Sequence, residues 1–342
     1  MRPPRFAGSR GNGGGLKVAI VGAGVAGLAA GRTLKQAGIR SVLYEKSRGP
    51  GGRVATRRVG PYTFDTGATS IAPRGLTIEK VMLEELDRSE LVEVTKPIYA
   101  HANLRPQRGD PTKNSVPRFV YRPGINHFAK LLAEGLDLRL NTTVDGLRRM
   151  DGKLEVEGEL YDRVILTPPI PQASLLLWSI GESRSIANAR YRTCVSIMLG
   201  YDKPLPETAY HALIDVEQRH PMTWVSLEST KSPGRAPDGH SAIVLQMSPT
   251  YSQNHYQTDD EVMLRDVIPW VVQLYGEDFR QPVEIDTKRW KYSQPELTAV
   301  FESANRANHG VILAGDGLSA GRVERAYESG VEAARLILEG AE

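Results

Sequence analysis

Residues 17–45 read KVAIVGAGVAGLAAGRTLKQAGIRSVLYE, and this stretch decides the fold. The apolar run 17–21 ends at Gly22, as a buried parallel strand does, and a helical pattern follows it. A second apolar run, 41–44, ends at Glu45. The stretch therefore predicts a β-α-β unit of the Rossmann type, which begins an α/β domain with a parallel sheet.

The turn between this strand and this helix carries the pattern Gly22-x-Gly24-x-x-Gly27. Gly22 allows a tight turn, Gly24 lets the backbone approach a pyrophosphate, and Gly27 lets the helix pack closely on the strand. The pyrophosphate would lie at the N-terminus of the helix, where free N–H groups face it. Glu45 stands where a carboxylate accepts hydrogen bonds from ribose hydroxyls, which favours FAD or NAD over a 2′-phosphorylated cofactor.

The residues after Glu45 favour FAD over NAD. The segment 47–53, Ser-Arg-Gly-Pro-Gly-Gly-Arg, is similar to the glycine–arginine signature of the flavin amine oxidase superfamily, in which this loop wraps the diphosphate and ribityl chain. Paired glycines suit a close approach of the backbone to phosphate, and Arg53 adds one charge-assisted hydrogen bond.

A third motif stands near the C-terminus. The apolar run 311–314 leads through Gly315-Asp316 into a helix, and proteins of the same superfamily end on a similar unit. Asp316 would accept a hydrogen bond from a ribityl hydroxyl. The N-terminus of the helix, near Arg322 and Val323, would face the flavin and stabilise its anionic reduced ring.

Through these motifs and further segments, the chain resembles the renalase family within the flavin amine oxidase superfamily, over nearly all of residues 17–338. The resemblance is carried by segments 51–53, 65–68, 123–125, 161–171, 288–294 and 315–317. The chain departs from the family at Gly67-Ala68-Thr69-Ser70, where animal renalase has Gly-Ala-Gln-Tyr against the flavin. Two small hydroxyl side chains there replace two large groups, so the pocket has another shape.

The resemblance implies a p-hydroxybenzoate-hydroxylase-like fold with non-covalently bound FAD. It also implies that a small hydride donor, a dihydronicotinamide isomer of NAD(P)H, is oxidised while O2 is reduced to H2O2. The expected FAD-binding residues, from the motifs and the resemblance together, are Gly22, Gly24, Ala26, Gly27, Glu45, Lys46, Gly52, Arg53, Gly67, Ala68, Thr69, Ser70, Val144, Thr167, Gly315, Asp316, Arg322 and Val323.

Hydride transfer to a flavin requires a stacked donor and exclusion of water, but neither a nucleophile nor a metal. We therefore expect no catalytic residue from the chain itself. The candidates for the substrate pocket are aromatic or amide residues, for each of which ordinary packing is an equal alternative: Tyr191, Trp224, Gln246, Trp290 and Tyr292. Cys194 is expected to be a buried, inert thiol within a strand.

Composition excludes several classes of protein. The net charge of +3 gives no indication of nucleic-acid binding. A single cysteine excludes an intramolecular disulfide, and the seven histidines show no metal-ligand spacing. No apolar run approaches the ~20 residues that cross a bilayer. We expect a metal-free cytoplasmic protein whose partners are the hydride donor, such as a dinucleotide, and O2; its oligomeric state stays open.

The order of the patterns predicts two domains. An FAD-binding domain would comprise residues 16–75, 118–170 and 296–342. A substrate domain, inserted as 76–117 and 171–295, would hold an antiparallel sheet, indicated by alternating apolar residues from Tyr191 to Met247. The basic, glycine-rich residues 1–15 predict a disordered extension.

Other elements are predicted from periodicity and turn residues. They are helices at 76–91, 124–132 and 323–338, a strand at 163–166, and strands within 136–157 that turn at Asp145-Gly146 and Asp151-Gly152.

Three alternative functions share the FAD motifs. An amine oxidase would use an aromatic cage for a neutral amine. A desaturase or isoprenoid reductase would need a long apolar tunnel. A non-catalytic flavin sensor would bind FAD without being reduced by any donor.

Overall fold

The computed structural model describes residues 15–186, 188–307 and 309–340, so most of the expected N-terminal extension lies outside the described residues. Its first sheet has five parallel strands in the order β19-β13-β1-β2-β9. They are β1 (Lys17–Val21), β2 (Arg40–Tyr44), β9 (Asp137–Arg139), β13 (Arg163–Leu166) and β19 (Val311–Leu313). With α1 (Val25–Gln36), the strands β1 and β2 confirm the predicted β-α-β unit.

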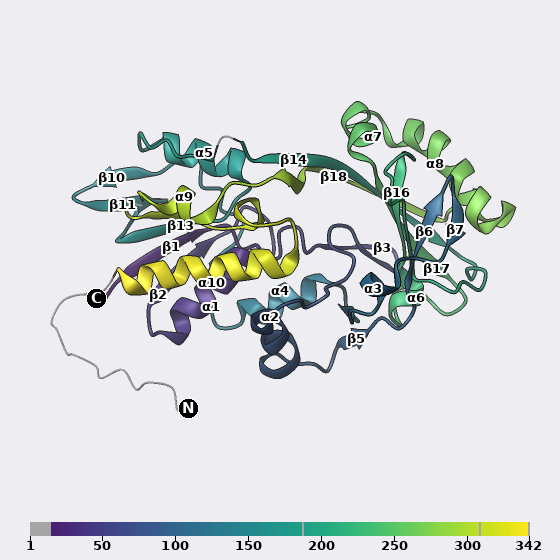
Figure 1. The fold of residues 1–342 in the computed structure, drawn as a ribbon, viewed down its shortest axis with the longest axis horizontal. Coiled ribbons are helices and arrows are strands. Elements are labelled where there is room, and N and C mark those ends of the chain that lie inside the picture. Colours follow the sequence, from purple (N-terminus) through teal and green to yellow (C-terminus); the bar gives the residue numbers. More distant parts are fainter. Residues whose placement is uncertain (1–14, 187, 308, 341–342) are drawn as a thin grey trace.

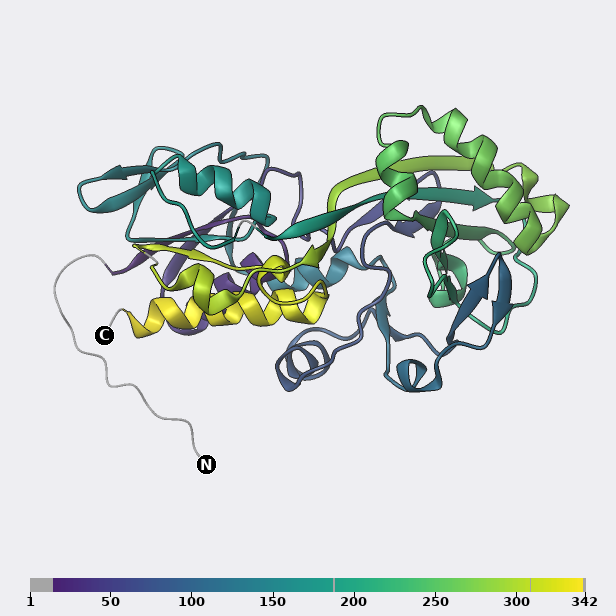
Figure 2. The ribbon, with the colours of Figure 1, turned by 45° about the horizontal axis from the view of Figure 1, so that its top comes forward.

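Helices α1 and α10 (Val323–Glu339) cover one face of this sheet, and α4 (Asn126–Ala133) packs beside α1 (Figure 1). A Cβ added to Gly330 of α10 would lie 2.0 Å from the carbonyl oxygen of Ala26 in α1. This close packing attaches the last segment of the chain to the first. On the other face lie α5 (Ile170–Trp178) and the meander of β10 (Arg148–Met150), β11 (Lys153–Val156) and β12 (Glu159–Tyr161) (Figure 2).

The second large sheet has seven strands in the order β18-β14-β17-β16-β15-β6-β7. They are β6 (Ile98–Ala102), β7 (Arg105–Gln107), β14 (Arg190–Tyr201), β15 (Ala212–Ile214), β16 (Met222–Leu227), β17 (Ser241–Met247) and β18 (Glu284–Leu297). All neighbours are antiparallel except β15 and β6. The long strands β14 and β18 run from the parallel-sheet part into this sheet, which carries α7 (Pro249–Asn254) and α8 (Asp260–Tyr275) (Figures 1 and 2).

The remaining elements are short. They are the hairpin of β3 (Thr56–Val59) and β4 (Tyr62–Asp65), the pair β5 (Leu91–Glu93) and β8 (Phe119–Tyr121), and the helices α2 (Leu76–Lys80), α3 (Pro111–Asn114), α6 (Glu228–Lys231) and α9 (Phe301–Asn305), with the single turns η1 (Val81–Glu85), η2 (Glu277–Arg280) and η3 (Asp316–Leu318). Tyr62 and Phe64 of β4 pack against Met198 and Val244 of the seven-stranded sheet. The β3–β4 hairpin therefore packs on the seven-stranded sheet and brings the residues that follow it next to that sheet.

Two of the predicted elements are wrong. The helix expected over 76–91 ends at Glu85, because Leu86 is extended and Asp87 accepts hydrogen bonds from Ser89 in a tight turn. Asp145-Gly146 is not a hairpin turn, since β9 before it pairs with β2 in the parallel sheet. The Asp151-Gly152 turn between β10 and β11 is confirmed.

The fold is α/β, with a Rossmann-type parallel sheet and an inserted, mainly antiparallel sheet. Each sheet has its own hydrophobic core. Helix α5 packs into the core of the parallel sheet, although the expected substrate domain includes residues 171–295. The exact domain boundaries stay a prediction. Across the described ranges, every helix is too short or too polar to span a bilayer.

Candidate active site

A cavity of about 1330 Å3 lies between the parallel sheet and the seven-stranded sheet. This exceeds the volume of about 300–1,000 Å3 that is usual for a single small ligand, so a dinucleotide and a second molecule fit. Most of the residues expected from the sequence line it: Gly22, Gly24, Ala26, Glu45, Lys46, Gly52, Arg53, Gly67, Ala68, Thr69, Ser70, Val144, Thr167, Gly315, Asp316, Arg322, Val323, Trp224, Gln246, Trp290 and Tyr292. Gly27 and Tyr191 are not among the lining residues.

The glycine turn after β1 forms one end of the cavity. Gly22 has a φ of 97°, which a side chain would strain, and the Thr167 hydroxyl donates to its carbonyl oxygen at 3.1 Å. A Cβ added to Gly27 would lie 2.0 Å from that same oxygen, so Gly27 permits the helix–strand contact without reaching the cavity. Gly24 has open space where a Cβ would stand. The free N–H groups at the start of α1 thus face room for a pyrophosphate.

Glu45 directly follows β2, lines this end of the cavity and is only 6% exposed. Its Oε2 accepts a hydrogen bond from the Ala23 N–H at 2.9 Å, and its Oε1 accepts one from the Ser47 N–H at 2.8 Å. These bonds fix the carboxylate against the glycine turn. Each oxygen keeps a second lone pair, which a ribose hydroxyl could use.

Arg53 and Asp316, expected to bind different parts of FAD, contact each other. The Arg53 guanidinium donates to both carboxylate oxygens, at 2.7 and 2.6 Å, and to the Ser293 carbonyl oxygen at 3.1 Å. The loop of Arg53 is itself held to the glycine turn, because the Gly51 N–H donates to the Ala23 carbonyl at 2.9 Å. These contacts draw the three cofactor motifs of the sequence to one site, and the residues present fit FAD.

Two pocket candidates hold the segment 66–70 in place. The Trp290 indole N–H donates to the Thr66 carbonyl oxygen at 2.9 Å, and the Gln246 amide donates to the Gly67 carbonyl oxygen at 2.7 Å. On its other side, Gly67 lies so close to Arg53 that an added Cβ would be 1.9 Å from the Arg53 carbonyl oxygen. The polar groups of Trp290 and Gln246 therefore position this segment, while their remaining surface lines the cavity.

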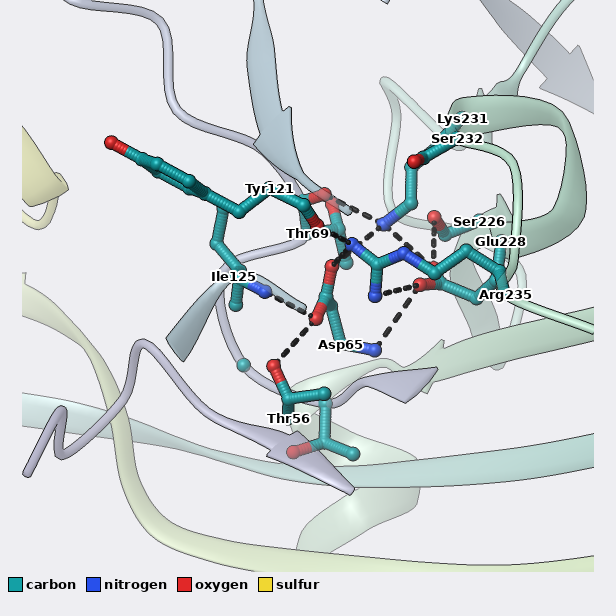
Figure 3. A network of polar contacts seen from close by, with 12 residues as sticks. Thr56, Asp65, Thr69, Tyr121, Ile125, Ser226, Glu228, Lys231, Ser232 and Arg235 are labelled. Carbon is teal, nitrogen blue, oxygen red and sulfur yellow. Dashed lines mark hydrogen bonds and ion pairs between the residues drawn. The ribbon is translucent and has the colours of Figure 1, made fainter. Parts of the chain in front are cut away.

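A buried ion network behind this segment escaped the sequence analysis (Figure 3). The side chains of Asp65, Glu228, Lys231 and Arg235 have no exposed surface. Asp65 Oδ2 accepts from Arg235 Nη2 at 2.8 Å and from Lys231 Nζ at 3.3 Å, and Glu228 Oε1 accepts from Lys231 Nζ at 2.8 Å. Lys231 also donates to the Thr69 carbonyl oxygen at 2.7 Å. The network thus attaches the segment 66–70 to α6 and the loop after it.

The charges in this network are matched. Burial alone would raise the pKa of Asp65, but Lys231 and Arg235 hold that pKa below its ordinary value. Burial raises the pKa of Glu228, and Lys231 opposes that rise only in part. No periodic pattern marks these residues in the sequence, because three of them stand on a short helix and an irregular loop. Of the four residues, only Asp65 belongs to a segment that the sequence had singled out, the segment 65–68 that carries the resemblance.

Of the other pocket candidates, Tyr292 and Trp224 line the cavity, whereas Tyr191 does not. Tyr191 packs under Gly317, and burial, followed by the charge of Asp316, raises the pKa of Tyr191 to about 12. Tyr292 meets the Tyr191 ring edge-on at 5.7 Å between centroids. Trp224 lines the cavity with a buried indole N–H that has no hydrogen-bond partner in the described part of the chain.

Cys194 corrects one expectation. It is half-buried rather than buried, and it lines the cavity opposite Trp290 in the β14–β18 register. Burial nevertheless raises the pKa of the thiol to about 11, so it stays protonated at neutral pH. Among the described residues, no group of three or more His, Cys, Asp or Glu side chains could hold a metal ion.

Two family sequence patterns match the chain. The pattern described as flavin containing amine oxidoreductase matches residues 112–338, and that of the NAD(P)-binding Rossmann-like domain matches residues 20–84. A zeta-carotene-forming phytoene desaturase from Myxococcus xanthus is 42% identical over 57 residues, which are 17% of this chain and 11% of the desaturase. That match therefore concerns a short part of either protein.

Solved structures share the whole fold. A candidate protoporphyrinogen oxidase from Exiguobacterium sp. 255-15 has a TM-score of 0.75 at 17% identity, over 95% of this chain and 99% of that one. Cyclohexylamine oxidase from Brevibacterium oxydans IH-35A has a TM-score of 0.72 at 13% identity, over 96% of this chain and 100% of that one. At such identities the likeness establishes the fold and leaves the substrate open.

Proposed function

The chain belongs to the family of flavin-containing amine oxidoreductases, and on that basis we propose its reaction. It is a flavin-dependent oxidoreductase. The proposed substrate is a small anionic hydride donor, a dihydronicotinamide isomer of NAD(P)H such as the 2- or 6-dihydro form. The donor loses a hydride to become NAD(P)+, and O2 takes up that hydride and one proton from solvent to become H2O2. When bound, FAD supplies the hydride acceptor and delivers the electrons to O2.

The charge of the cavity wall carries this proposal. The seven-stranded sheet contributes to the wall Lys288 and Lys291, which form no ion pair with the described residues, and Arg192 and Arg289, whose carboxylate partners stand outside the wall. None of the described Asp or Glu residues of this sheet lines the cavity. The carboxylates that do line it stand on the parallel-sheet side: Glu45, Asp145, Asp316 and Glu324. A cationic wall attracts an anionic donor and raises its local concentration, whereas it repels a protonated amine.

The aromatic side chains of the pocket support the same choice. The Nζ of Lys288 lies 5.0 Å from the ring centre of Trp290, and that of Lys291 lies 5.6 Å from the ring centre of Tyr292. These rings therefore already make cation–π contacts within the chain. A lysine covers one face of each ring, which leaves less free aromatic surface for a cage around an amine.

The chain's own residues would position the donor rather than react with it. Trp290 and Gln246 fix the segment 66–70 against the seven-stranded sheet, which gives the flavin side of the pocket a rigid wall. The indole N–H of Trp224, which stands beside Gln246 in the same sheet, has no hydrogen-bond partner among the described residues and suits a carbonyl oxygen such as that of a carboxamide. Placement of this kind supplies much of the rate of a hydride transfer.

The test is anaerobic reduction of the FAD-saturated protein. We expect 2- and 6-dihydro-NAD to bleach the flavin absorbance rapidly and ordinary 4-dihydro-NAD, the control, to leave it unchanged. Admission of air should restore the absorbance and yield one H2O2 for each donor oxidised. A flavin that stays oxidised with all three dinucleotides would reject the proposed substrate.

Further arms of the same experiment separate the alternatives. Bleaching by putrescine or cyclohexylamine but not by the dinucleotides would identify an amine oxidase. Bleaching by a long isoprenoid alone would identify a desaturase-type reaction. Bound flavin that no donor reduces would identify a sensor.

A further inference from the structure

Two arginines with no part in the proposed cofactor site lie together in the cavity wall. An antiparallel bridge joins Ile71 and Phe119, with N–H···O distances of 2.9 and 2.8 Å in the two directions. In that register Arg118 stands opposite Ala72, and Arg74 follows two residues further along. Both arginines line the cavity. Burial lowers the pKa of Arg118, and the charge of Arg74 lowers it further, so the two guanidinium groups lie within electrostatic range of each other.

Neither arginine forms an ion pair with any residue in the described part of the chain. Arg118 donates from Nη1 to the Val116 carbonyl oxygen at 3.2 Å and from Nη2 to the Lys113 carbonyl oxygen at 2.7 Å, and both acceptors are neutral. The Nε of Arg74 is buried and has no hydrogen-bond partner there. Glu328, which lies against the neighbouring Gly75, is paired with Arg325 at 2.8 Å.

Arg48, which also lines the cavity, is exposed and forms no ion pair with the described residues; the remaining arginines of the wall show the contrast. Each of the following has a carboxylate partner: Arg53 with Asp316, Arg57 with Asp286, Arg192 with Glu296, Arg289 with Asp260, and Arg322 with Glu324. Two adjacent guanidinium groups without a counter-ion repel each other, and their unused donors are fixed in a fork that matches phosphate or carboxylate oxygens. An anion between them would remove the repulsion and satisfy those donors.

We propose that Arg74 and Arg118 form an anion-binding subsite for the substrate. The inference rests on the proposed function, because it assigns the charged group of the hydride donor to two named residues. For a dinucleotide donor that group is a phosphate. The subsite explains how a pocket for a small reacting ring would select donors that carry an anionic tail.

The subsite is separate from the expected phosphate site of FAD. That site lies at Gly24 and the start of α1. Arg74 follows the flavin-facing segment 66–70, and Arg118 precedes β8, so both stand at the junction with the seven-stranded sheet. The subsite should therefore remain open when FAD is bound.

The test measures binding of inorganic pyrophosphate to the FAD-saturated protein by calorimetry, at constant ionic strength. We expect Arg74→Gln and Arg118→Gln each to weaken binding about tenfold or more, since each removes charge-assisted hydrogen bonds. Arg108→Gln is the matched control, because Arg108 is exposed on the same connecting stretch and does not line the cavity. Arg74→Lys and Arg118→Lys should each keep part of the affinity that the glutamine variants lose.

Malonate, measured in parallel, distinguishes the two kinds of anion. Tighter binding of pyrophosphate identifies a phosphate subsite, and tighter binding of malonate identifies a carboxylate subsite and a donor other than a dinucleotide. Absence of binding of both anions to the wild-type protein overturns the proposal, as does affinity unchanged in both glutamine variants. Anion binding that depends on the arginines, in a protein that oxidises no dihydronicotinamide, supports the subsite and rejects the proposed function.

Two further measurements keep the proposal testable if a variant folds poorly. In the wild-type protein, pyrophosphate should protect Arg74 and Arg118, but not Arg108, from modification by phenylglyoxal, as read by mass spectrometry; equal modification of all three would overturn it. In variants that fold, the KM for the dinucleotide donor should rise about tenfold with little change in kcat. The KM for 1-methyl-dihydronicotinamide, which has no phosphate, should stay the same.

Discussion

The guanidinium of Arg53 donates to both carboxylate oxygens of Asp316, a residue 263 positions further along the chain. The side chains are 29% and 9% exposed, so the pair is largely shielded from water. It joins the loop after β2 to the turn after β19. From their motifs, we expected these two loops to bind different parts of one FAD molecule. The ion pair sets the distance between them.

Asp316→Asn should weaken FAD binding about tenfold, or about 1.4 kcal/mol. The substitution keeps the side-chain shape but leaves Arg53 without its counter-charge, so the two loops lose their fixed spacing. Titration of the apoprotein with FAD, followed by flavin fluorescence, measures the change. Asp286→Asn is the control, because its partner Arg57 belongs to a more exposed pair. FAD affinity equal to that of the wild type would show that the pair does not organise the site.

The ion network of Asp65 should dominate stability at the junction of the two sheets. Asp65→Asn leaves the buried charges of Lys231 and Arg235 with a single carboxylate, and the loss of one partner of a buried pair costs about 3–5 kcal/mol. Denaturant unfolding measures this cost. Asp137→Asn, which breaks a surface pair with Arg139, should have a far smaller effect. Similar losses in the two variants would contradict the assigned role.

The contribution of Asp65 should also depend on pH in one direction. Lys231 and Arg235 overcome the effect of burial and hold the folded-state pKa of Asp65 below the ordinary value of 3.8. Its stabilisation is therefore present above pH 3.8 and is lost as the pH falls through the lower, folded-state pKa. The stability difference between wild type and Asp65→Asn should be constant at neutral pH and shrink below about pH 3.8. A difference that grows on acidification would have the wrong sign.

The local parts of the fold could be predicted from the sequence, and the contacts between distant parts could not. Gly22, Gly24 and Glu45 stand at fixed spacing in one β-α-β unit, so a short pattern predicted both the unit and its place at the cavity. The pairing of Arg53 with Asp316 depends on how the two ends of the parallel sheet are arranged. No local pattern encodes it, even though each residue was named.

The inserted part was predictable as a sheet but not in its details. Alternating apolar residues predicted β14, β16 and β17, whereas Lys231 and Arg235 resemble ordinary loop cations. Their burial follows from the arrival of Asp65 on the β3–β4 hairpin from a remote part of the chain. Arg74 and Arg118 were missed for the same reason, because the bridge between Ile71 and Phe119 brings them together.

Cys194 should react slowly with alkylating reagents despite its place in the cavity wall. Burial raises the pKa of its thiol to about 11, so only about one molecule in 1,000 carries the thiolate at pH 8. The rate of alkylation by iodoacetamide, followed by mass spectrometry, should rise about tenfold for each pH unit up to that value. A rate that levels off near pH 8 would show an ordinary thiol.

Cys194→Ser should keep its full content of FAD, because the proposed binding of FAD is non-covalent. Denaturation should release all of the flavin from both the variant and the wild type. Flavin that stays with the unfolded wild-type chain, and is absent from the variant, would indicate a covalent bond to this residue.

Alanine substitutions at two glycines of the first turn should affect cofactor binding and folding stability separately. An alanine at position 24 meets no protein atom within 4 Å of its Cβ, so Gly24→Ala should fold with a Tm close to that of the wild-type apoprotein. The added methyl would point into the space expected to hold the pyrophosphate, so FAD affinity should fall at least tenfold. At position 27 the Cβ would stand 2.0 Å from the Gly22 carbonyl oxygen, and backbone atoms cannot move aside cheaply. Gly27→Ala should therefore lower the Tm of the apoprotein. Gly38→Ala cannot serve as a control for this change, because Gly38 has a φ of 78°, which would strain an alanine.

The comparison requires both proteins without FAD for the Tm and with added FAD for the affinity. A destabilised Gly24→Ala apoprotein would mean that the turn itself, and not the ligand, demands the glycine. Unchanged FAD affinity in that variant would place the pyrophosphate elsewhere in the cavity and remove the basis for treating Arg74 and Arg118 as a separate anion subsite.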